Sequence, residues 1–232
     1  MENHYIRQGA TGTNNGTDWT NAWTQLPSTL IRGDTYYIAD GTYPGYSFDD
    51  PVSGSIFITI KKATIIEHGT DTGWNNSYGD GQAIFYSSGT PVISISTSYW
   101  IIDGQNKYGI KINRTYINND AYGIQMGSSI TQITLKYVEI AGPAGSDPYP
   151  FNYPHRGIYA ISGQSYITIS HCYIHGLPVG IRSESLTHFT LEYTDLSDIF
   201  SIGTSHPDVL YMAGYSDYTT LKYNIVHNFA PI

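Results

Sequence analysis

The chain has 232 residues, only 13% of them charged, and a formal net charge of −8 at pH 7. This charge argues against nucleic acid and anionic membranes as partners, and no apolar run is long enough to insert into a membrane. The single cysteine, Cys172, excludes a disulfide within the chain, and the 24 glycines and 22 tyrosines suit many short strands and turns.

The first predicted element is a helix over residues 18–26. Trp19, Ala22, Trp23 and Leu26 follow the spacing of one helix face, and Asp18 or Thr17 provides an N-cap. We expect this helix to cover the N-terminal end of the core. Residues 1–4 lack the apolar core of a signal peptide, so an exported protein would already have lost its signal.

Four apolar segments follow and are predicted to be strands. They cover residues 35–39, 56–60, 91–95 and 99–102, and Asp-Gly pairs at 40–41, 80–81 and 103–104 mark turns between the elements. Their register with one another is not determined by the pattern.

The strongest signal is an internal repeat. Four segments align without gaps and have mostly apolar residues at positions 1, 3, 6 and 8: Ile133–Ile140, Ile167–Ile174, Phe189–Leu196 and Thr219–Val226. They begin 34, 22 and 30 residues apart. The alternating start predicts a strand with one buried face, and the slip before position 6 predicts a corner. A coil of about 22 residues with variable loops is typical of a β-solenoid.

A second strand precedes each of these segments, with its third and fifth residues pointing inward. The copies are Tyr122–Met126, Arg156–Ala160, Val179–Ser183 and Asp208–Met212, with Tyr108–Ile112 as an earlier copy. The sequence therefore predicts an all-β, single-stranded parallel β-helix over residues 31–232, with residues 1–30 as a cap region of the same single domain. A two-sheet sandwich is the alternative, but it requires antiparallel hairpins with short Asn-Gly or Asp-Gly turns.

No matching C-terminal lid is predicted, since the chain stops at 228–232 just after a strand pair. That end suggests truncation, a lid made by those few residues, or an oligomer formed through the uncovered coil.

The repeat resembles the pectate-lyase-like superfamily of right-handed parallel β-helices, over roughly residues 30 to 228. The segments Gly9–Trp19 and Arg32–Tyr43 are similar to the start of secreted bacterial members. The resemblance implies a right-handed helix and an extracellular or cell-surface protein. His206–Val209 aligns Asp208 with a catalytic acid of polygalacturonases, but the other motifs of that family are absent, so its hydrolytic mechanism is not carried over.

Stacking the second set of strands predicts two columns of residues, one on the outer face and one at the entrance of the strands. The fourth position gives Lys111, Gln125, Tyr159, Arg182 and Tyr211. The first position gives Tyr108, Tyr122, Arg156, Val179 and Asp208, with His155 and His206 immediately upstream. Sugars stack on aromatic rings, and guanidinium groups hold carboxylates or sulfates. A polysaccharide, anionic or neutral, is therefore the expected partner, and we expect His155, Arg156, Tyr159, Arg182, His206, Asp208 and Tyr211 to share one solvent-open surface that binds it.

A lyase removes the proton next to a uronate carboxylate, which requires a neutral base and a cation that stabilises the enolate. The catalytic candidates are His155, Tyr159, Arg182, His206 and Asp208, and the substrate-binding candidates are Lys111, Gln125, Arg156 and Tyr211. In this scheme Tyr159 or His155 is the base and Arg182 or Arg156 the stabilising cation.

Other features have structural interpretations. Asp208 has no acidic partner in its column, and Glu184 is the nearest candidate for the second carboxylate that hydrolysis needs. Glu139 and Asp195 share the seventh repeat position with Tyr173 between them, which favours solvated acids over a calcium site, so no cofactor is expected. The fifth position, with Tyr137, His171, Tyr193 and Tyr223, is interpreted as a structural stack at a corner, and Cys172 as a buried small residue.

Three functions remain open. The first is a lyase-type enzyme, the second a non-catalytic adhesin-like binding module, and the third a trimeric tailspike-like structural protein.

Overall fold

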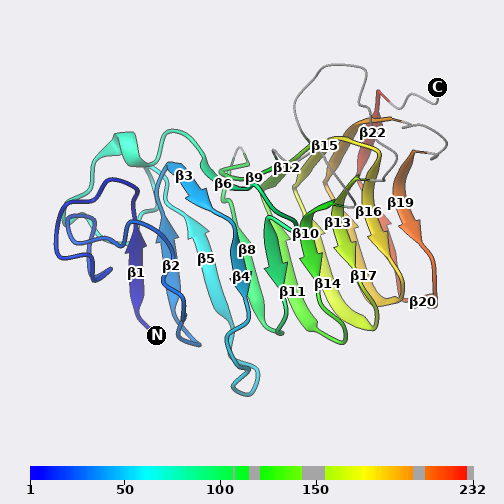
Figure 1. The fold of residues 1–232 in the computed structure, drawn as a ribbon, viewed down its shortest axis with the longest axis horizontal. Coiled ribbons are helices and arrows are strands. Elements are labelled where there is room, and N and C mark those ends of the chain that lie inside the picture. The colour runs from blue at the N-terminus through cyan, green and yellow to red at the C-terminus, as the bar shows by residue number, and fades with distance from the viewer. Residues whose placement is uncertain (107, 115–120, 143–154, 201–206, 229–232) are drawn as a thin grey trace.

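The computed structural model describes residues 1–106, 108–114, 121–142, 155–200 and 207–228. In these residues the protein is all-β, with three sheets in which every strand pair is parallel. The chain visits the sheets in the same order in successive coils, an arrangement consistent with a parallel β-helix. Figure 1 shows the coils stacked along the long axis of the molecule, from the N-terminal to the C-terminal end. No helix in this part of the chain could cross a membrane.

The sheets are named A, B and C in the order in which a coil enters them. Sheet A contains β1 (Asn3–Ile6), β2 (Thr35–Ile38), β5 (Ile58–Lys62), β8 (Trp100–Asp103), β11 (Thr131–Lys136), β14 (Gln164–Ser170), β17 (Leu186–Glu192), β20 (Ser216–Asp217) and β21 (Thr220–Lys222). Sheet B contains β3 (Gly41–Pro44), β6 (Ala83–Ser87), β9 (Ile110–Arg114), β12 (Val138–Ala141), β15 (Tyr173–Leu177), β18 (Asp195–Ile199) and β22 (Ile225–His227). Sheet C contains β4 (Tyr46–Phe48), β7 (Ile93–Ile95), β10 (Ala121–Met126), β13 (His155–Ala160), β16 (Val179–Ser183) and β19 (Asp208–Met212).

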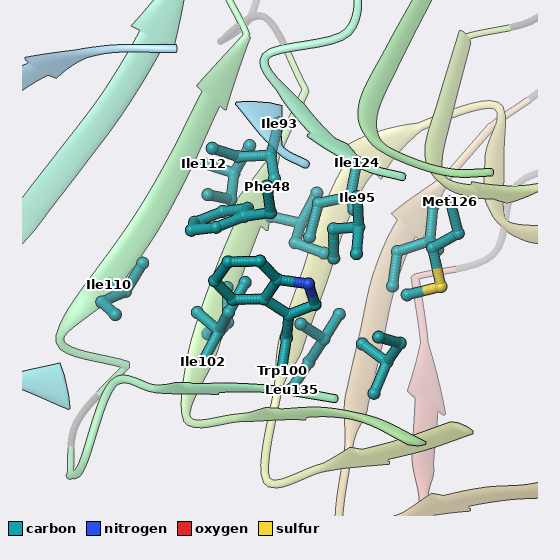
Figure 2. Packing of buried hydrophobic residues seen from close by; sticks show 14 of the residues in the cluster. Phe48, Ile93, Ile95, Trp100, Ile102, Ile110, Ile112, Ile124, Met126 and Leu135 are labelled. Carbon is teal, nitrogen blue, oxygen red and sulfur yellow. The ribbon is translucent and has the colours of Figure 1, made fainter. Parts of the chain in front are cut away.

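The core is built from columns of inward residues in successive coils. Ile133 lies opposite Ile167, which lies opposite Phe189, and Leu135 is followed in the same way by Ile169, Leu191 and Leu221. The predicted register of these repeats is confirmed, and their pairing is parallel. Figure 2 shows side chains from all three sheets meeting at the centre, where Phe48 packs on Trp100 with ring centroids 4.9 Å apart. Close packing of this kind is the main source of stability in a solenoid.

The corner between sheets A and B is confirmed as a stack of aromatic rings. Tyr137, His171, Tyr193 and Tyr223 all have left-handed backbone angles, with φ between 48° and 56°. Their neighbouring rings lie 4.8 to 4.9 Å apart. Left-handed residues turn the chain sharply at moderate strain, and the ring contacts along the column offset that strain. Cys172, next to His171, is fully buried as predicted.

The helix predicted over residues 18–26 is wrong. The only helical element among the described residues is a 3₁₀ turn, Asn76–Tyr78. The backbone around Trp23 instead bonds to β1: Trp23 N donates to Tyr5 O (2.9 Å), and Arg7 N donates to Trp23 O (2.8 Å). These bonds cover the edge of β1 that no other strand of sheet A pairs with, so an irregular segment with one bridge at Trp23 takes the role expected of a helical lid.

The apolar residues of this segment face two different environments, which explains the false helical pattern. Trp19 and Ala22 are fully buried in a small cluster with Tyr5 and Tyr37 on the outer side of sheet A. Trp23 is partly exposed and packs against the main core, stacking near Tyr36. The spacing of the four residues thus reflects two separate contacts and not one helix face.

Candidate functional site

The outer face of sheet C carries the predicted column of polar and aromatic residues. Gln125, Tyr159, Arg182 and Tyr211 lie opposite one another on β10, β13, β16 and β19. Ser94 of β7 and Ser47 of β4 continue the same column toward the N-terminal end. The first-position column is also confirmed, with Tyr122, Arg156, Val179 and Asp208 in register.

The placement of Lys111 and Tyr108 in these columns is wrong. Lys111 belongs to β9 in sheet B, where it lies opposite Ile84 of β6 and Glu139 of β12. Tyr108 precedes the same strand. Inward and outward residues alternate in the same way in all three sheets, so the pattern identifies a strand but not the sheet to which it belongs.

Five side chains from four adjacent strands interleave on this face, and we call them the aromatic–guanidinium strip: Tyr122, Arg156, Tyr159, Arg182 and Tyr211. Tyr122 and Tyr159 stack with centroids 4.9 Å apart. The guanidinium carbon of Arg156 lies 5.3 Å from the Tyr122 centroid and 5.1 Å from that of Tyr159. Arg182 lies 5.9 Å from the Tyr159 centroid and 5.2 Å from that of Tyr211. The four distances from a guanidinium carbon to a ring centroid are all within the range of cation–π attraction.

The charge of Arg182 is balanced by the carboxylate of Glu184, whose orientation the sequence pattern does not predict. Arg182 donates to Glu184 Oε1 from Nε (2.9 Å), and its Nη2 lies 2.7 Å from the same oxygen. The Tyr159 hydroxyl donates to that oxygen at 3.4 Å. Burial, with the nearby carboxylate of Glu184, raises the pKa of Tyr159, so this phenol stays protonated and is poorly suited to act as a base.

The predicted site residues differ in their access to solvent. Tyr211 is 37% exposed, and Tyr159, Arg182, Gln125 and Asp208 are partly exposed. His155 is only 1% exposed and Arg156 only 5%, so the expectation that all candidates share an open surface fails for these two. His206 lies outside the described residues. The strip is therefore an open surface with a buried guanidinium beneath it.

A shallow cleft of about 310 Å³ lies on the same sheet, toward its N-terminal end. Its lining is rich in hydroxyl groups and includes Gly45, Tyr46, Ser47, Ser87, Thr90, Pro91, Val92 and Ser94. Ser47 and Ser94 belong to the column that leads to Gln125 and Tyr159. The cleft and the strip are thus parts of one continuous face.

A charged cluster on sheet B was missed by the sequence interpretation. Glu139 was expected to be a solvated acid, but it is buried, and its carboxylate contacts Lys111 Nζ (2.6 Å), His175 Nε2 (3.0 Å) and Gln82 Nε2 (2.8 Å). Burial alone would raise its pKa, but the hydrogen bonds from His175, Gln82 and Lys111 outweigh that effect and lower the pKa to about 2. The sequence could have revealed this cluster through the cross-strand pairing of Lys111 with Glu139. That pairing becomes apparent only when β9 is assigned to sheet B.

Glu2, His4 and Asp34 bring potential metal-ligating atoms within 4.8 Å of one another in the described part of the chain. His4 Nε2 lies 3.0 Å from Asp34 Oδ2, and Asp34 Oδ1 accepts a hydrogen bond from Glu2 N (2.7 Å). These contacts occupy both oxygens of Asp34 and account for its burial without a metal ion.

Comparison with known proteins gives no relative from which a function can be transferred. No protein-family model matches the chain, and neither a curated protein nor a solved structure does.

Proposed function

We propose that the protein is an extracellular glycan-binding protein that holds a polysaccharide along the outer face of sheet C. The observation that carries this proposal is the continuity of that face, from the hydroxyl-lined cleft at Ser47 and Ser94 through Gln125 to the aromatic–guanidinium strip. The finer assignment to a right-handed helix of the pectate-lyase-like superfamily is part of the same proposal and rests on the repeat pattern and on the three parallel sheets.

The geometry of the face suits a long ligand. Neighbouring strands are spaced about 4.8 Å apart, so a column running from β4 to β19 crosses the strands along the axis of the solenoid. The rings of Tyr122 and Tyr159 stack on each other, which leaves their edges for a ligand. A chain of sugar units offers a matching series of hydroxyl groups that both donate and accept.

The charge on this face favours a neutral glycan over an anionic one. The guanidinium groups of Arg156 and Arg182 are matched in number by the carboxylates of Glu184 and Asp208, and Arg182 already contacts Glu184. An acidic polymer would have to compete with Glu184 for Arg182, and would gain no net attraction from a chain of charge −8.

Binding without turnover is better supported than a lyase reaction. Of the two bases considered, Tyr159 has a raised pKa and His155 is 1% exposed. Tyr159 lies on the open face but stays protonated, and His155 lies beneath that face, away from a ligand. This favours the adhesin-like function over the enzyme among the three alternatives.

The proposal is tested by affinity electrophoresis through gels that contain neutral glucans, galactans or mannans, with pectate and alginate as acidic comparators. We expect retardation by at least one neutral polymer, no stronger retardation by the acidic ones, and no new absorbance from unsaturated uronates. Mobility unchanged by every polymer, or release of unsaturated products, would contradict the proposal.

A further inference from the structure

The corner between sheets A and B is enlarged in two successive coils. In later coils one or two residues make this corner, as at Tyr137 between β11 and β12. Residues 63–82 occupy the same corner between β5 and β6, and residues 104–109 occupy it between β8 and β9, although Lys107 lies outside the described residues. Long insertions on a regular scaffold are where binding sites are commonly built.

A cleft of about 550 Å³ lies between these two insertions, within the range of small-molecule sites. Its walls are lined by Lys62, Thr64, Ile65, Ile66, Gly79, Asp80, Gly81, Gln82, Asn106 and Gly109. The lining thus combines an exposed carboxylate, two amides and two isoleucines. Ile65 is 48% exposed and Ile66 is 89% exposed, so the rim offers an unusual amount of apolar surface to water.

The buried side chain of Lys62, which lines the cleft, forms an ion pair with Asp40. Lys62 stands at an inward position of β5, is 1% exposed, and its Nζ lies 2.6 Å from Asp40 Oδ1. Asp40 Oδ2 accepts a hydrogen bond from Gly81 N (2.5 Å). Burial lowers the pKa of Lys62 against the opposing effect of Asp40, and burial, with a smaller contribution from Asp80, raises the pKa of Asp40. The charge of Lys62 is balanced by Asp40, so Lys62 offers no unpaired cation to an acidic ligand.

The amide of Gln82 in the wall is held in place before any ligand arrives. Gln82 Nε2 donates to Tyr108 O and to Glu139 Oε2, both at 2.8 Å, which leaves its oxygen to accept. Glu139 is in turn held by Lys111 and His175. Preorganised groups lose little conformational entropy when a ligand binds.

We infer that this cleft binds a single neutral sugar unit, separately from the glycan face of sheet C. Amide groups and the carboxylate of Asp80 match the paired hydroxyl groups of a sugar, each of which donates and accepts. Ile65 and Ile66 supply an apolar wall for its C–H face. Among the described residues of this lining, Asp80 is the exposed charged one, so uronate sugars are disfavoured. The inference does not depend on the function proposed for sheet C.

The inference is tested by NMR titration of the whole chain with D-glucose, D-galactose, D-mannose and N-acetyl-D-glucosamine at millimolar concentrations, with D-galacturonate as the acidic comparator. The side-chain amide signals of Gln82 and Asn106 should shift saturably with at least one neutral sugar and not with galacturonate. No shift of either signal with any neutral sugar, or an equal response to galacturonate, would overturn the inference.

Two cleft variants and two controls make the assignment specific. Asp80→Asn should weaken binding by about tenfold or more, the loss expected for one hydrogen bond to a charged group. Asn106→Trp should fill the cleft and abolish binding. Asp198→Asn changes an exposed aspartate of β18, far along the chain, and should bind like the wild type. Wild-type affinity in both cleft variants would overturn the inference. Arg182→Ala should leave this titration unchanged, which separates its outcome from that of the sheet C proposal.

Discussion

The guanidinium carbon of Arg182 on β16 lies 5.2 Å from the ring centroid of Tyr211 on β19, the next strand of sheet C. The same guanidinium is held by Glu184 from its own strand end. Its position is therefore fixed by both an aromatic ring and a carboxylate, and Glu184 offsets its positive charge.

The Glu184 contact predicts how ligand preference can be changed. Glu184→Gln removes one negative charge and frees Arg182, so we expect stronger retention on acidic polysaccharides, most visible at low salt because the Debye length is then longer. Affinity electrophoresis at low and physiological ionic strength measures this. Retention on acidic polymers that does not change with the substitution would show that Arg182 is not reached by ligand.

The core columns predict a steep cost for shortening one inward residue. Ile169 is 1% exposed between Leu135 and Leu191, so Ile169→Ala should lower the free energy of unfolding by about 2 to 5 kcal/mol. Thr168 points outward from the same strand, and Thr168→Ala should change it by less than about 0.5 kcal/mol. Urea unfolding followed by circular dichroism compares the two, and similar losses would contradict the inward assignment.

The two tryptophans of the N-terminal segment should contribute unequally. Trp19 is fully buried and its Nε1 donates to His68 O (3.0 Å), whereas Trp23 is partly exposed. Trp19→Ala should cost about 3 to 5 kcal/mol, and Trp23→Ala should cost less. Deleting residues 1–26 should produce aggregation, because the edge of β2 becomes unpaired. A monomeric deletion variant in light scattering would argue against this covering role.

The Glu139 cluster predicts that the free energy of unfolding decreases at acidic pH. The pKa of Glu139 falls from 4.5 to about 2 on folding, so its contribution is fully present above about pH 4.5 and is lost as the pH falls toward 2. Glu139→Gln should therefore reduce stability at neutral pH and flatten the decline between these values. Thermal melts from pH 2 to 7 test this, with Glu2→Gln, at an exposed site, as the control. A decline of the same steepness in Glu139→Gln and wild type would contradict the assignment.

Much of the fold could be predicted because the repeat carries two signals at once. Inward alternation places Ile133, Ile167 and Phe189 in one column, and the phase slip places Tyr137 and His171 at the corner. Neither signal says which of the three sheets a strand joins, and so Lys111 was placed on the wrong face. The correct partner, Glu139, becomes visible only when β9 is paired with β12.

The wrong predictions share a physical cause: the spacing of apolar residues along the chain does not determine which part of the structure packs against each of them. Trp19 and Trp23 fit a helix, yet one packs outside sheet A and the other against the core. Lys62 occupies an inward position at which the alternating pattern predicts an apolar residue. Its burial is tolerated because its ammonium contacts Asp40, brought close by the register of β2 and β5, and donates to the Ala63 carbonyl.

The central claim is that a glycan is held on the outer face of sheet C. It is tested most directly by comparing one arginine variant and one lysine variant for retention on the neutral polysaccharide that binds the wild type. Arg182→Ala removes the guanidinium between Tyr159 and Tyr211, while Lys222→Ala removes an exposed cation of β21 in sheet A that pairs with Glu192 (2.8 Å). We expect Arg182→Ala to weaken retention markedly and Lys222→Ala to leave it unchanged, with equal melting temperatures. Equal retention of both variants and the wild type would contradict the account and leave the strip as an ordinary solenoid surface.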